Sequence, residues 1–263
     1  MYQPTMKEYA LITGASKGIG KSIALLLAKK GYNLLLVARS EADLQDLGNS
    51  VKKEHGVEVA WLSADLSEPG AADIVFNWVN NIDVPVSILI NNAGYGMWGN
   101  FDELEIKQQL SMVRVNIDAL IELSYLLLPL LKQSQQAFIL NVASTAAYQA
   151  VPTLAVYSAS KAFVLSFSRA LRFELKNSPV SVSCLCPGPT DTGFAHRAGM
   201  DALAELAAKF NMSPADVAAI GIKGMFKKKA EIVPGFLNKV SAAAARHSPK
   251  ALIESVTAGL YKH

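Results

Sequence analysis

The first strand-like segment of this chain runs without a break into a glycine-rich turn. Tyr9–Thr13 is a short apolar run, and Gly14-Ala15-Ser16-Lys17-Gly18-Ile19-Gly20 follows it directly. Residues 21–30 are amphipathic and end at Gly31. This order predicts a strand, a tight turn and a capped helix. Because such glycines let the backbone approach a pyrophosphate at a helix N-terminus, the turn favours a nucleotide site over a plain turn. Its spacing is GxxxGxG, not the commoner GxGxxG.

The same alternation of apolar strands and amphipathic helices continues along the chain. Further strands are expected at 33–38, 58–62, 86–90, 138–142, 180–185 and 231–233. Helices are expected at about 69–80, 104–131, 155–177 and 213–229, with more helix up to residue 263. Strands that alternate with helices in this way form a parallel sheet with right-handed crossovers. Since the composition does not change along its 263 residues, we expect one α/β domain over residues 1–263.

Small and polar residues gather where several predicted strands end. Ser63-Ala64-Asp65-Leu66 follows the third strand, Asn91-Asn92-Ala93-Gly94 the fourth, and Pro187-Gly188-Pro189-Thr190-Asp191-Thr192 the sixth. Ligands bind at this carboxyl edge of an open parallel sheet. The three segments are therefore predicted to meet at one site.

Arg39, which follows the second strand, bears on the choice of nucleotide. An acidic side chain in this region would accept a hydrogen bond from a ribose 2′-hydroxyl, whereas an arginine suits a 2′-phosphate. Lys17, inside the glycine turn, adds a second cation. The alternative is that both are solvent-facing charges at a strand end.

Tyr157 and Lys161 are four residues apart, so in a helix they lie on one face. A free tyrosine has a pKa near 10, and a phenol that exchanges protons near neutral pH needs a shift of roughly 3 units, which a nearby cation favours. A YxxxK pattern alone is common by chance. Asn116, a poor residue for a helix interior, is expected either as a surface amide or at a kink where its side chain holds a water.

Taken together, the motifs resemble the short-chain dehydrogenase/reductase family, in its NADP-preferring form. The match covers about residues 7–192 in the expected order, through TGASKGIG at 13–20, Asp65, NNAG at 91–94, Asn116, Ser144, YSASK at 157–161 and PGPTDT at 187–192. The resemblance implies a Rossmann-type doubly wound parallel sheet of about seven strands with helices on both faces. The remainder resembles a bacterial branch loosely akin to 3-ketoacyl and hydroxysteroid reductases.

The resemblance also implies roles for individual residues. Tyr157 is the general acid in reduction and the base in oxidation, Lys161 holds the nicotinamide ribose and keeps the phenol acidic, Ser144 steadies the carbonyl oxygen, and Asn116 positions a water. The residues expected to bind NADP are Gly14, Ser16, Lys17, Gly18, Ile19, Gly20, Arg39, Asp65, Leu66, Asn92, Ala93, Gly94, Tyr157, Lys161, Pro187, Gly188, Thr190 and Thr192. No metal is implied.

Composition excludes several other classes of protein. With 51% hydrophobic and 18% charged residues, the chain is globular, and its apolar runs are too short or interrupted to span a bilayer. The net charge of +3 is small, so nucleic-acid binding is not expected. Residues 1–7 carry no signal-peptide pattern, and the cytoplasm is the expected compartment. Cys184 and Cys186 are expected to be buried thiols on opposite faces of a strand, unable to pair.

The substrate is expected to be a largely apolar ketone or aldehyde. The expected pocket wall carries no charge that stands out and comprises Tyr95, Met97, Trp98, Tyr148, Leu154, Phe194 and Met200. Residues 190–212 are expected to be a lid or a helix packed on the core. A 3-oxoacyl thioester reductase is the specific alternative, with Arg169 and Arg172 facing a carrier protein, and a non-catalytic NADP-binding sensor is the alternative of another class.

Two further expectations concern assembly. The resemblance implies a homodimer or homotetramer, with helices at 104–131 and 155–177 at the dimer face. The helical extension at about 235–263 is expected to pack on the domain, to contact another subunit, or to lie on a membrane surface.

Overall fold

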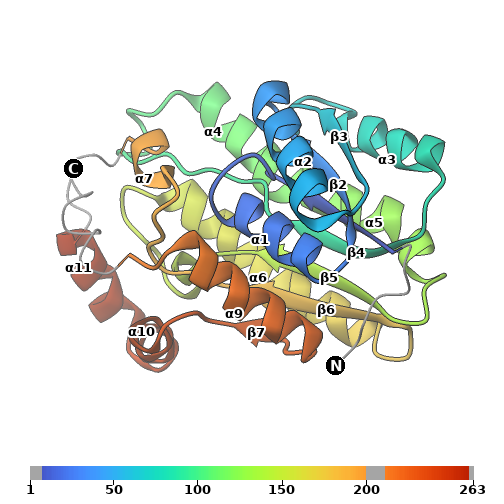
Figure 1. Ribbon diagram of the computed structural model, residues 1–263. Coiled ribbons are helices and arrows are strands. Elements are labelled where there is room, and N and C mark those ends of the chain that lie inside the picture. Colours follow the sequence, from blue (N-terminus) through green and yellow to red (C-terminus); the bar gives the residue numbers. More distant parts are fainter. Residues whose placement is uncertain (1–7, 200–210, 261–263) are drawn as a thin grey trace.

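The computed structural model describes residues 8–199 and 211–260, and its seven strands form one sheet (Figure 1). All neighbouring strands are parallel, in the order β3-β2-β1-β4-β5-β6-β7. The strands are β1 (Tyr9–Thr13), β2 (Asn33–Ala38), β3 (Val59–Ser63), β4 (Val86–Asn91), β5 (Ala137–Val142), β6 (Val180–Leu185) and β7 (Glu231–Ile232). This is the doubly wound order, in which the chain changes direction between β1 and β4.

The helices cover both faces of the sheet. They are α1 (Gly18–Lys29), α2 (Glu41–His55), α3 (Ala71–Ile82), α4 (Ile106–Val113), α5 (Ala119–Leu131), α6 (Ala155–Glu174), α7 (Phe194–Arg197), α9 (Pro214–Phe226), α10 (Phe236–His247) and α11 (Lys250–Leu260). A π-helical turn, η1 (Arg114–Asp118), joins α4 to α5, and a 3-10 turn, η2 (Thr145–Tyr148), follows β5. The fold class, the strand positions and the main helices predicted from the sequence are confirmed.

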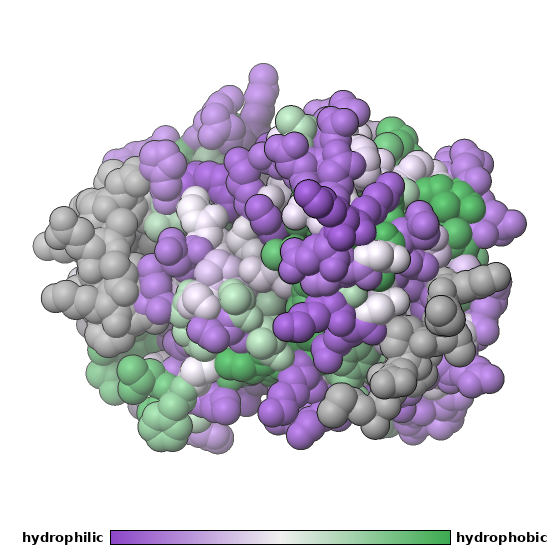
Figure 2. All heavy atoms as spheres, viewed as in Figure 1, coloured by the Kyte–Doolittle hydropathy of each residue, from purple (hydrophilic) through white to green (hydrophobic). Residues whose placement is uncertain are grey.

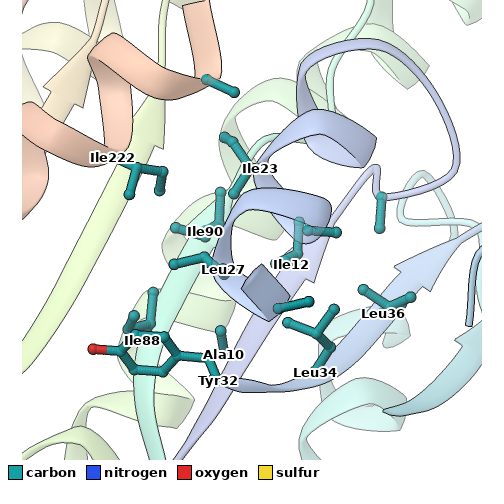
Figure 3. Packing of buried hydrophobic residues seen from close by; sticks show 14 of the residues in the cluster. Ala10, Ile12, Ile23, Leu27, Tyr32, Leu34, Leu36, Ile88, Ile90 and Ile222 are labelled. Carbon is teal, nitrogen blue, oxygen red and sulfur yellow. The ribbon is translucent and has the colours of Figure 1, made fainter. Parts of the chain in front are cut away.

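Two hydrophobic layers hold the helices against the sheet. Side chains alternate along each strand, so Ala10 and Ile12 face α1, α2 and α9, whereas Leu11 faces α3, α5 and α6. Figure 3 shows Ile23 and Leu27 of α1 packed over the first of these faces. Because both faces are covered, the inner strands are almost continuously apolar, which is the pattern visible in the sequence.

Local signals fix where several helices start and stop. Ser40 caps α2 by accepting a hydrogen bond from the backbone N–H of Asp43, and Gly56 ends that helix at a φ of 66°. Ser213 caps α9 in the same way, with Pro214 at the first helical position. These caps set the directions in which α2 and α9 leave the carboxyl edge of the sheet.

Cys184 and Cys186 are buried free thiols, as expected, but their expected placement on opposite faces of the strand was wrong. Cys184 lies in β6 and Cys186 just after it, both fully buried, with their Sγ atoms 3.8 Å apart. Residues two apart in a strand point to the same face, because side chains alternate with a period of two. The two thiols are therefore neighbours in the core.

Candidate active site

The glycine turn lies at the carboxyl end of β1 and leads into the N-terminus of α1. Gly14 and Gly18 adopt φ values of 63° and 56°, which only glycine adopts without strain. The Asn92 side-chain N–H donates to the Thr13 and Gly14 carbonyls at 3.0 and 3.1 Å, which ties the turn to the end of β4. The first turn of α1 contains no acidic residue. Its backbone N–H groups and positive dipole end are thus suited to an anion.

One continuous cavity of about 1860 Å³ runs along the carboxyl edge of the sheet. It exceeds the roughly 300–1,000 Å³ of ordinary small-molecule pockets, so it has room for a dinucleotide together with a substrate. Of the residues predicted to bind NADP or to catalyse, all line this cavity except Gly20 and Asn116. A Cβ on Gly20 would overlap the Gly14 carbonyl, so Gly20 shapes the turn from behind.

Two ion pairs lie at the end of the cavity beyond β2. Lys17 Nζ is 3.3 Å from Asp43 Oδ2, and Arg39 Nη1 is 3.9 Å from Asp65 Oδ2. Burial acts to raise the pKa of Asp65, but hydrogen bonds from the N–H and hydroxyl of Ser67, together with the charge of Arg39, outweigh it, and the pKa lies below its ordinary value. Both cations are mostly exposed and line the cavity, so they are available to an anionic group there.

Tyr157 and Lys161 lie one turn apart on α6, as predicted. Lys161 Nζ is 5.8 Å from the centroid of the Tyr157 ring and donates to the Val142 carbonyl at 3.0 Å. Burial lowers the pKa of Lys161 to about 8, although the nearby Cys184 and Cys186 act to raise it. The Tyr157 ring packs against Phe194, with centroids 5.4 Å apart. The phenol and the ammonium therefore share a nearly dry part of the cavity.

Ser144 enters the same part of the cavity from the end of β5. It is the N-cap of η2, and its Oγ accepts a hydrogen bond from the Ala146 N–H at 3.1 Å. The next residue, Thr145, donates its N–H to the Pro187 carbonyl at 2.8 Å. Ser144 is thus fixed between η2 and the loop that follows β6.

Asn116 is buried within the π-helical turn η1 and is 1% exposed, so the surface-amide alternative was wrong. Its Oδ1 accepts from the Tyr95 N–H, and its Nδ2 donates to the Tyr95 carbonyl and to Ser160 Oγ. A Cβ on Gly94 would lie 2.9 Å from Asn116 Oδ1 and 3.1 Å from Lys161 Nζ. Asn116 therefore lies directly behind Gly94, next to Lys161. A π-helical turn inside a helix is often found at a functional site.

The other end of the cavity is lined mainly by apolar side chains. Of the expected wall, Tyr95, Leu154 and Phe194 line it. Met97 and Trp98 pack behind them. Tyr148 was placed wrongly, because its hydroxyl donates to Glu231 Oε1 at 2.7 Å and it is not among the lining residues. Met200 lies outside the described residues.

Sequence reasoning missed several lining residues, because they come from segments far apart in the chain that meet only in the fold: α4, η1, η2 and the loop after it, α7, and α10. These are Ser111, Val115, Ala146, Gln149, Val151, His196, Arg197, Phe236, Leu237, Asn238 and Ser241. Arg197 shows that the wall is not free of charge. The run of apolar residues that opens α10, Phe236-Leu237, was the one signal in the sequence that could have indicated them.

The two ends of the segment that was expected as a lid lie side by side. Asp191 and Met212 are joined by a hydrogen bond from the Asp191 N–H to the Met212 carbonyl at 3.1 Å. Between them, α7 lies against the loop after β4, where the Trp98 N–H donates to the Ala198 carbonyl at 2.9 Å. Residues 200–210 lie outside the described part of the chain.

Comparison with known proteins identifies the family. The family model for short chain dehydrogenase matches residues 8–202. The chain belongs to the short-chain dehydrogenase family. This short-chain dehydrogenase is therefore an oxidoreductase that binds a nicotinamide cofactor and acts on CH–OH or C=O groups.

Three relatives illustrate this membership. The ketoacyl reductase HetN of Nostoc sp. is 33% identical over 226 residues, which cover 85% of this dehydrogenase and 77% of that protein. The very-long-chain 3-oxoacyl-CoA reductase of Rattus norvegicus is 31% identical over 188 residues, covering 70% and 60%. A solved short-chain dehydrogenase from Sphingobium yanoikuyae, in complex with NADPH, has a TM-score of 0.80 and 29% identity, covering 93% and 97%.

Neither a metal-binding group of side chains nor a membrane-spanning helix occurs in the described residues. In the described part of this dehydrogenase, no three His, Cys, Asp or Glu side chains form a group that could hold a metal ion. Over the same residues, no helix has the length and apolar character needed to cross a membrane.

Proposed function

We propose that this short-chain dehydrogenase uses NADP(H) to transfer hydride between the nicotinamide and a largely apolar ketone, aldehyde or secondary alcohol. The observation that carries the proposal is that Ser144, Tyr157 and Lys161 line the same cavity as the glycine turn. Hydride transfer requires the carbonyl carbon to be held against the nicotinamide, with a proton donor aimed at its oxygen. A cavity that combines a phosphate-binding turn with a phenol and an ammonium meets these needs.

The cavity fits a dinucleotide along its length. The turn Gly14–Gly20 and the N-terminus of α1 would hold the pyrophosphate, and Asp65 with Leu66 would contact the adenine. Arg39 and Lys17 would contact the 2′-phosphate that distinguishes NADP from NAD. Asn92, Ala93 and Gly94 would lie along the middle of the dinucleotide. Pro187, Gly188, Thr190 and Thr192 would hold the nicotinamide end.

When bound, the cofactor supplies or accepts the hydride, and the side chains of this chain manage the proton. In reduction, Tyr157 Oη gives its proton to the carbonyl oxygen as negative charge develops there. Lys161 holds the nicotinamide ribose and lowers the phenol pKa when charged. Ser144 Oγ donates to the same carbonyl oxygen. Asn116 holds the backbone of Tyr95 and positions a water for proton exchange.

The apolar end of the cavity supports the proposed class of substrate. Val115, Val151, Leu154 and Phe194 offer apolar surface near Tyr157, each buried CH2 of a ligand contributing about 0.8 kcal/mol. The second candidate, a 3-oxoacyl thioester, is favoured by the names of the Nostoc and rat relatives. It would place an acyl chain against the same surface.

The carrier-protein contact expected for that second candidate has less support. Arg172 donates to the Ser181 hydroxyl and to the Val182 and Lys228 carbonyls, and Arg169 lies 3.4 Å from Glu231. Both guanidinium groups already have partners within the chain.

Steady-state NADPH oxidation over a panel of apolar ketones, aldehydes, 3-oxoacyl thioesters and small charged keto acids tests the proposal. Turnover of the apolar carbonyls is expected. Turnover restricted to small charged keto acids would contradict the class of substrate. Tight NADPH binding without turnover of any compound would favour the non-catalytic sensor.

We also propose a homodimer or homotetramer in the cytoplasm, with α4, α5 and α6 at the subunit contact. Large apolar side chains are exposed on these helices, including Leu110, Tyr125 and Phe173, which are 50%, 77% and 68% exposed. Large apolar side chains exposed to this extent on neighbouring helices favour a protein–protein contact. Light scattering with size-exclusion chromatography of Tyr125→Lys would show a shift to monomer if this face is the contact.

A further inference from the structure

A largely buried carboxylate, Glu231, joins three separate elements beside the substrate end of the cavity. Glu231 is the first residue of β7, and its side chain is 14% exposed. Its Oε1 accepts from the Tyr148 hydroxyl at 2.7 Å and from Arg246, and its Oε2 accepts from Arg169 Nη1 at 3.4 Å. The donors come from η2, α10 and α6. A carboxylate taken out of water needs such donors, so these contacts hold one another in place.

Arg246 contacts Tyr148 as well as Glu231. Its guanidinium carbon lies 4.6 Å from the centroid of the Tyr148 ring, within the range of a cation–π contact. Glu231, Tyr148 and Arg246 therefore form a closed triangle, which we call the Glu231 anchor. Burial, with Cys186 and Glu231 nearby, raises the pKa of Tyr148 well above its ordinary value, so its hydroxyl stays a donor.

On one side, the anchor fixes the turn that carries Ser144. Tyr148 is the last residue of η2, whereas Ser144 is its N-cap. The start of this turn is held by the hydrogen bond from Thr145 to Pro187. Its end is held by the bond from Tyr148 to Glu231. Gln149 and Val151, which line the cavity, follow directly after the anchored residue.

On the other side, the anchor fixes the C-terminal helices. Arg246 lies in the last turn of α10, whose first residues, Phe236, Leu237 and Asn238, line the mouth of the cavity. Phe236 and Leu237 are 78% and 64% exposed, and Figure 2 shows hydrophobic surface at the lower left, where Figure 1 places α10. A Cβ on Gly188 would clash with Asn238, so α10 also packs closely on the loop after β6.

The next helix, α11, reinforces this arrangement. Thr257 is 3% exposed, and its hydroxyl lies 3.3 Å from the Ala150 carbonyl and donates within its own helix. The wall from Ser144 to Val151 is thus backed by α10 and α11. Within the described residues, the C-terminal extension packs on the domain, as the first of the three expectations stated.

We propose that Glu231 is a positioning residue for the substrate: it holds the wall at residues 144–151 and helix α10 at a fixed separation and so sets the width of the substrate end of the cavity. The inference rests on the proposed function of that cavity. Glu231 does not line the cavity, so it acts through Tyr148 and Arg246. The proposal gives the C-terminal helices a part in substrate selection.

The test compares Glu231→Gln, Tyr148→Phe, Arg246→Met and Arg246→Lys with wild type. Glu254→Gln on the exposed face of α11 is the matched control. For each protein, kcat and KM are measured with a bulky apolar ketone, a small ketone and NADPH. Hydrogen exchange is measured over the whole chain. The exchange experiment does not depend on turnover, so it tests the anchor even if the proposed reaction is wrong.

Loss of the anchor should raise KM for the bulky ketone by roughly tenfold, the usual effect of losing a hydrogen bond to a charged group. KM for NADPH should rise less than KM for the bulky ketone, because the anchored elements contact the loop after β6, at the nicotinamide end of the proposed cofactor site, whereas the pyrophosphate would lie at the glycine turn after β1. Amide exchange should become faster at residues 145–151 and 236–247, but not in β1 to β4. Arg246→Lys, which keeps the charge, should raise KM for the bulky ketone less than Arg246→Met does. Glu254→Gln should match wild type in both KM and exchange.

Two outcomes would overturn the proposal. In the first, the anchor variants keep the KM values and the local exchange of wild type. In the second, every kinetic constant and exchange in all strands change together, which would mean that Glu231 only supports global stability. If wild type turns over no carbonyl, the proposed function fails, whereas localised exchange at 145–151 and 236–247 would still support the anchor.

Discussion

Lys161 Nζ lies 5.8 Å from the centre of the Tyr157 ring, on the same face of α6 and one turn further along. The ammonium is buried and donates a hydrogen bond to the Val142 carbonyl at 3.0 Å. A cation held at this distance favours the ionised phenol, but burial makes the cation itself costly. The ionisation of Tyr157 therefore depends on whether Lys161 is charged, and the charge of Lys161 depends on its burial.

Tyr157→Phe should reduce turnover by roughly 10²- to 10⁴-fold, the usual contribution of a general acid. NADPH affinity should change by less than about threefold, since the substitution keeps the ring that packs on Phe194. Steady-state kinetics and a fluorescence titration of NADPH measure the two effects. Turnover equal to that of wild type would exclude Tyr157 as the proton donor.

Lys161 should make the stability of the cofactor-free protein depend on pH. Its pKa falls from 10.5 to about 8 on folding, so between these values the unfolded chain binds more protons and the free energy of unfolding rises with pH. The favourable contribution is complete above the unfolded pKa and is lost as pH falls through about 8.

Urea unfolding at pH 7 and pH 9.5 checks this dependence against Lys161→Met. From pH 7 to pH 9.5, the free energy of unfolding of wild type should rise by about 2 kcal/mol relative to that of the variant, at 1.36 kcal/mol for each pKa unit. If the difference in free energy of unfolding between the two proteins is the same at both pH values, the pKa of Lys161 is not lowered.

Arg39→Asp should move cofactor preference from NADPH towards NADH. Loss of a charge-assisted contact with the 2′-phosphate is worth about 1 to 3 kcal/mol, or roughly tenfold to a hundredfold in the ratio of kcat/KM values. Lys53→Asp, at an exposed position on α2, is the control for the change in net charge. An unchanged ratio would assign the 2′-phosphate to Lys17, which Lys17→Ala would then reveal.

Gly94→Ala should damage activity more than stability. The new Cβ would lie 2.9 Å from Asn116 Oδ1 and 3.1 Å from Lys161 Nζ, so both groups must move. Overpacking of this kind costs about 1 to 3 kcal/mol, and the displaced Lys161 should lower kcat at least about tenfold. Gly259→Ala, whose Cβ would meet no atom within 4 Å, is the control. Full activity in Gly94→Ala would contradict the close packing of Gly94 against Asn116 and Lys161.

The fold was largely predictable because its signals are local. Tyr9–Thr13 and Asn33–Ala38 are continuous apolar runs, and the structure places strands at the same residues. The glycine turn was predictable from the sequence, because positive φ angles at Gly14 and Gly18 require glycine. The spacing of Tyr157 and Lys161 placed both on one helix face.

Other features depend on contacts between distant segments, and no local pattern of residues predicts them. Tyr148 was expected at the substrate, but Glu231, far along the chain, binds its hydroxyl and turns it away. The sequence around Asn116 is compatible with a surface or an interior position, and its contacts with Tyr95 and Ser160 place it in the interior. Propensity cannot distinguish such alternatives, because tertiary hydrogen bonds decide them.

The parallel sheet, the nucleotide turn and the catalytic candidates were all predictable from the order of residues, because the signal for each lies within a short stretch of the chain. The surroundings of these features are set by the folded structure. It placed α10 and α11 against the wall that begins at Ser144, and it buried Lys161 deeply enough to lower its pKa to about 8. Burial and pairing are properties of segments brought together by folding, and no local pattern contains them.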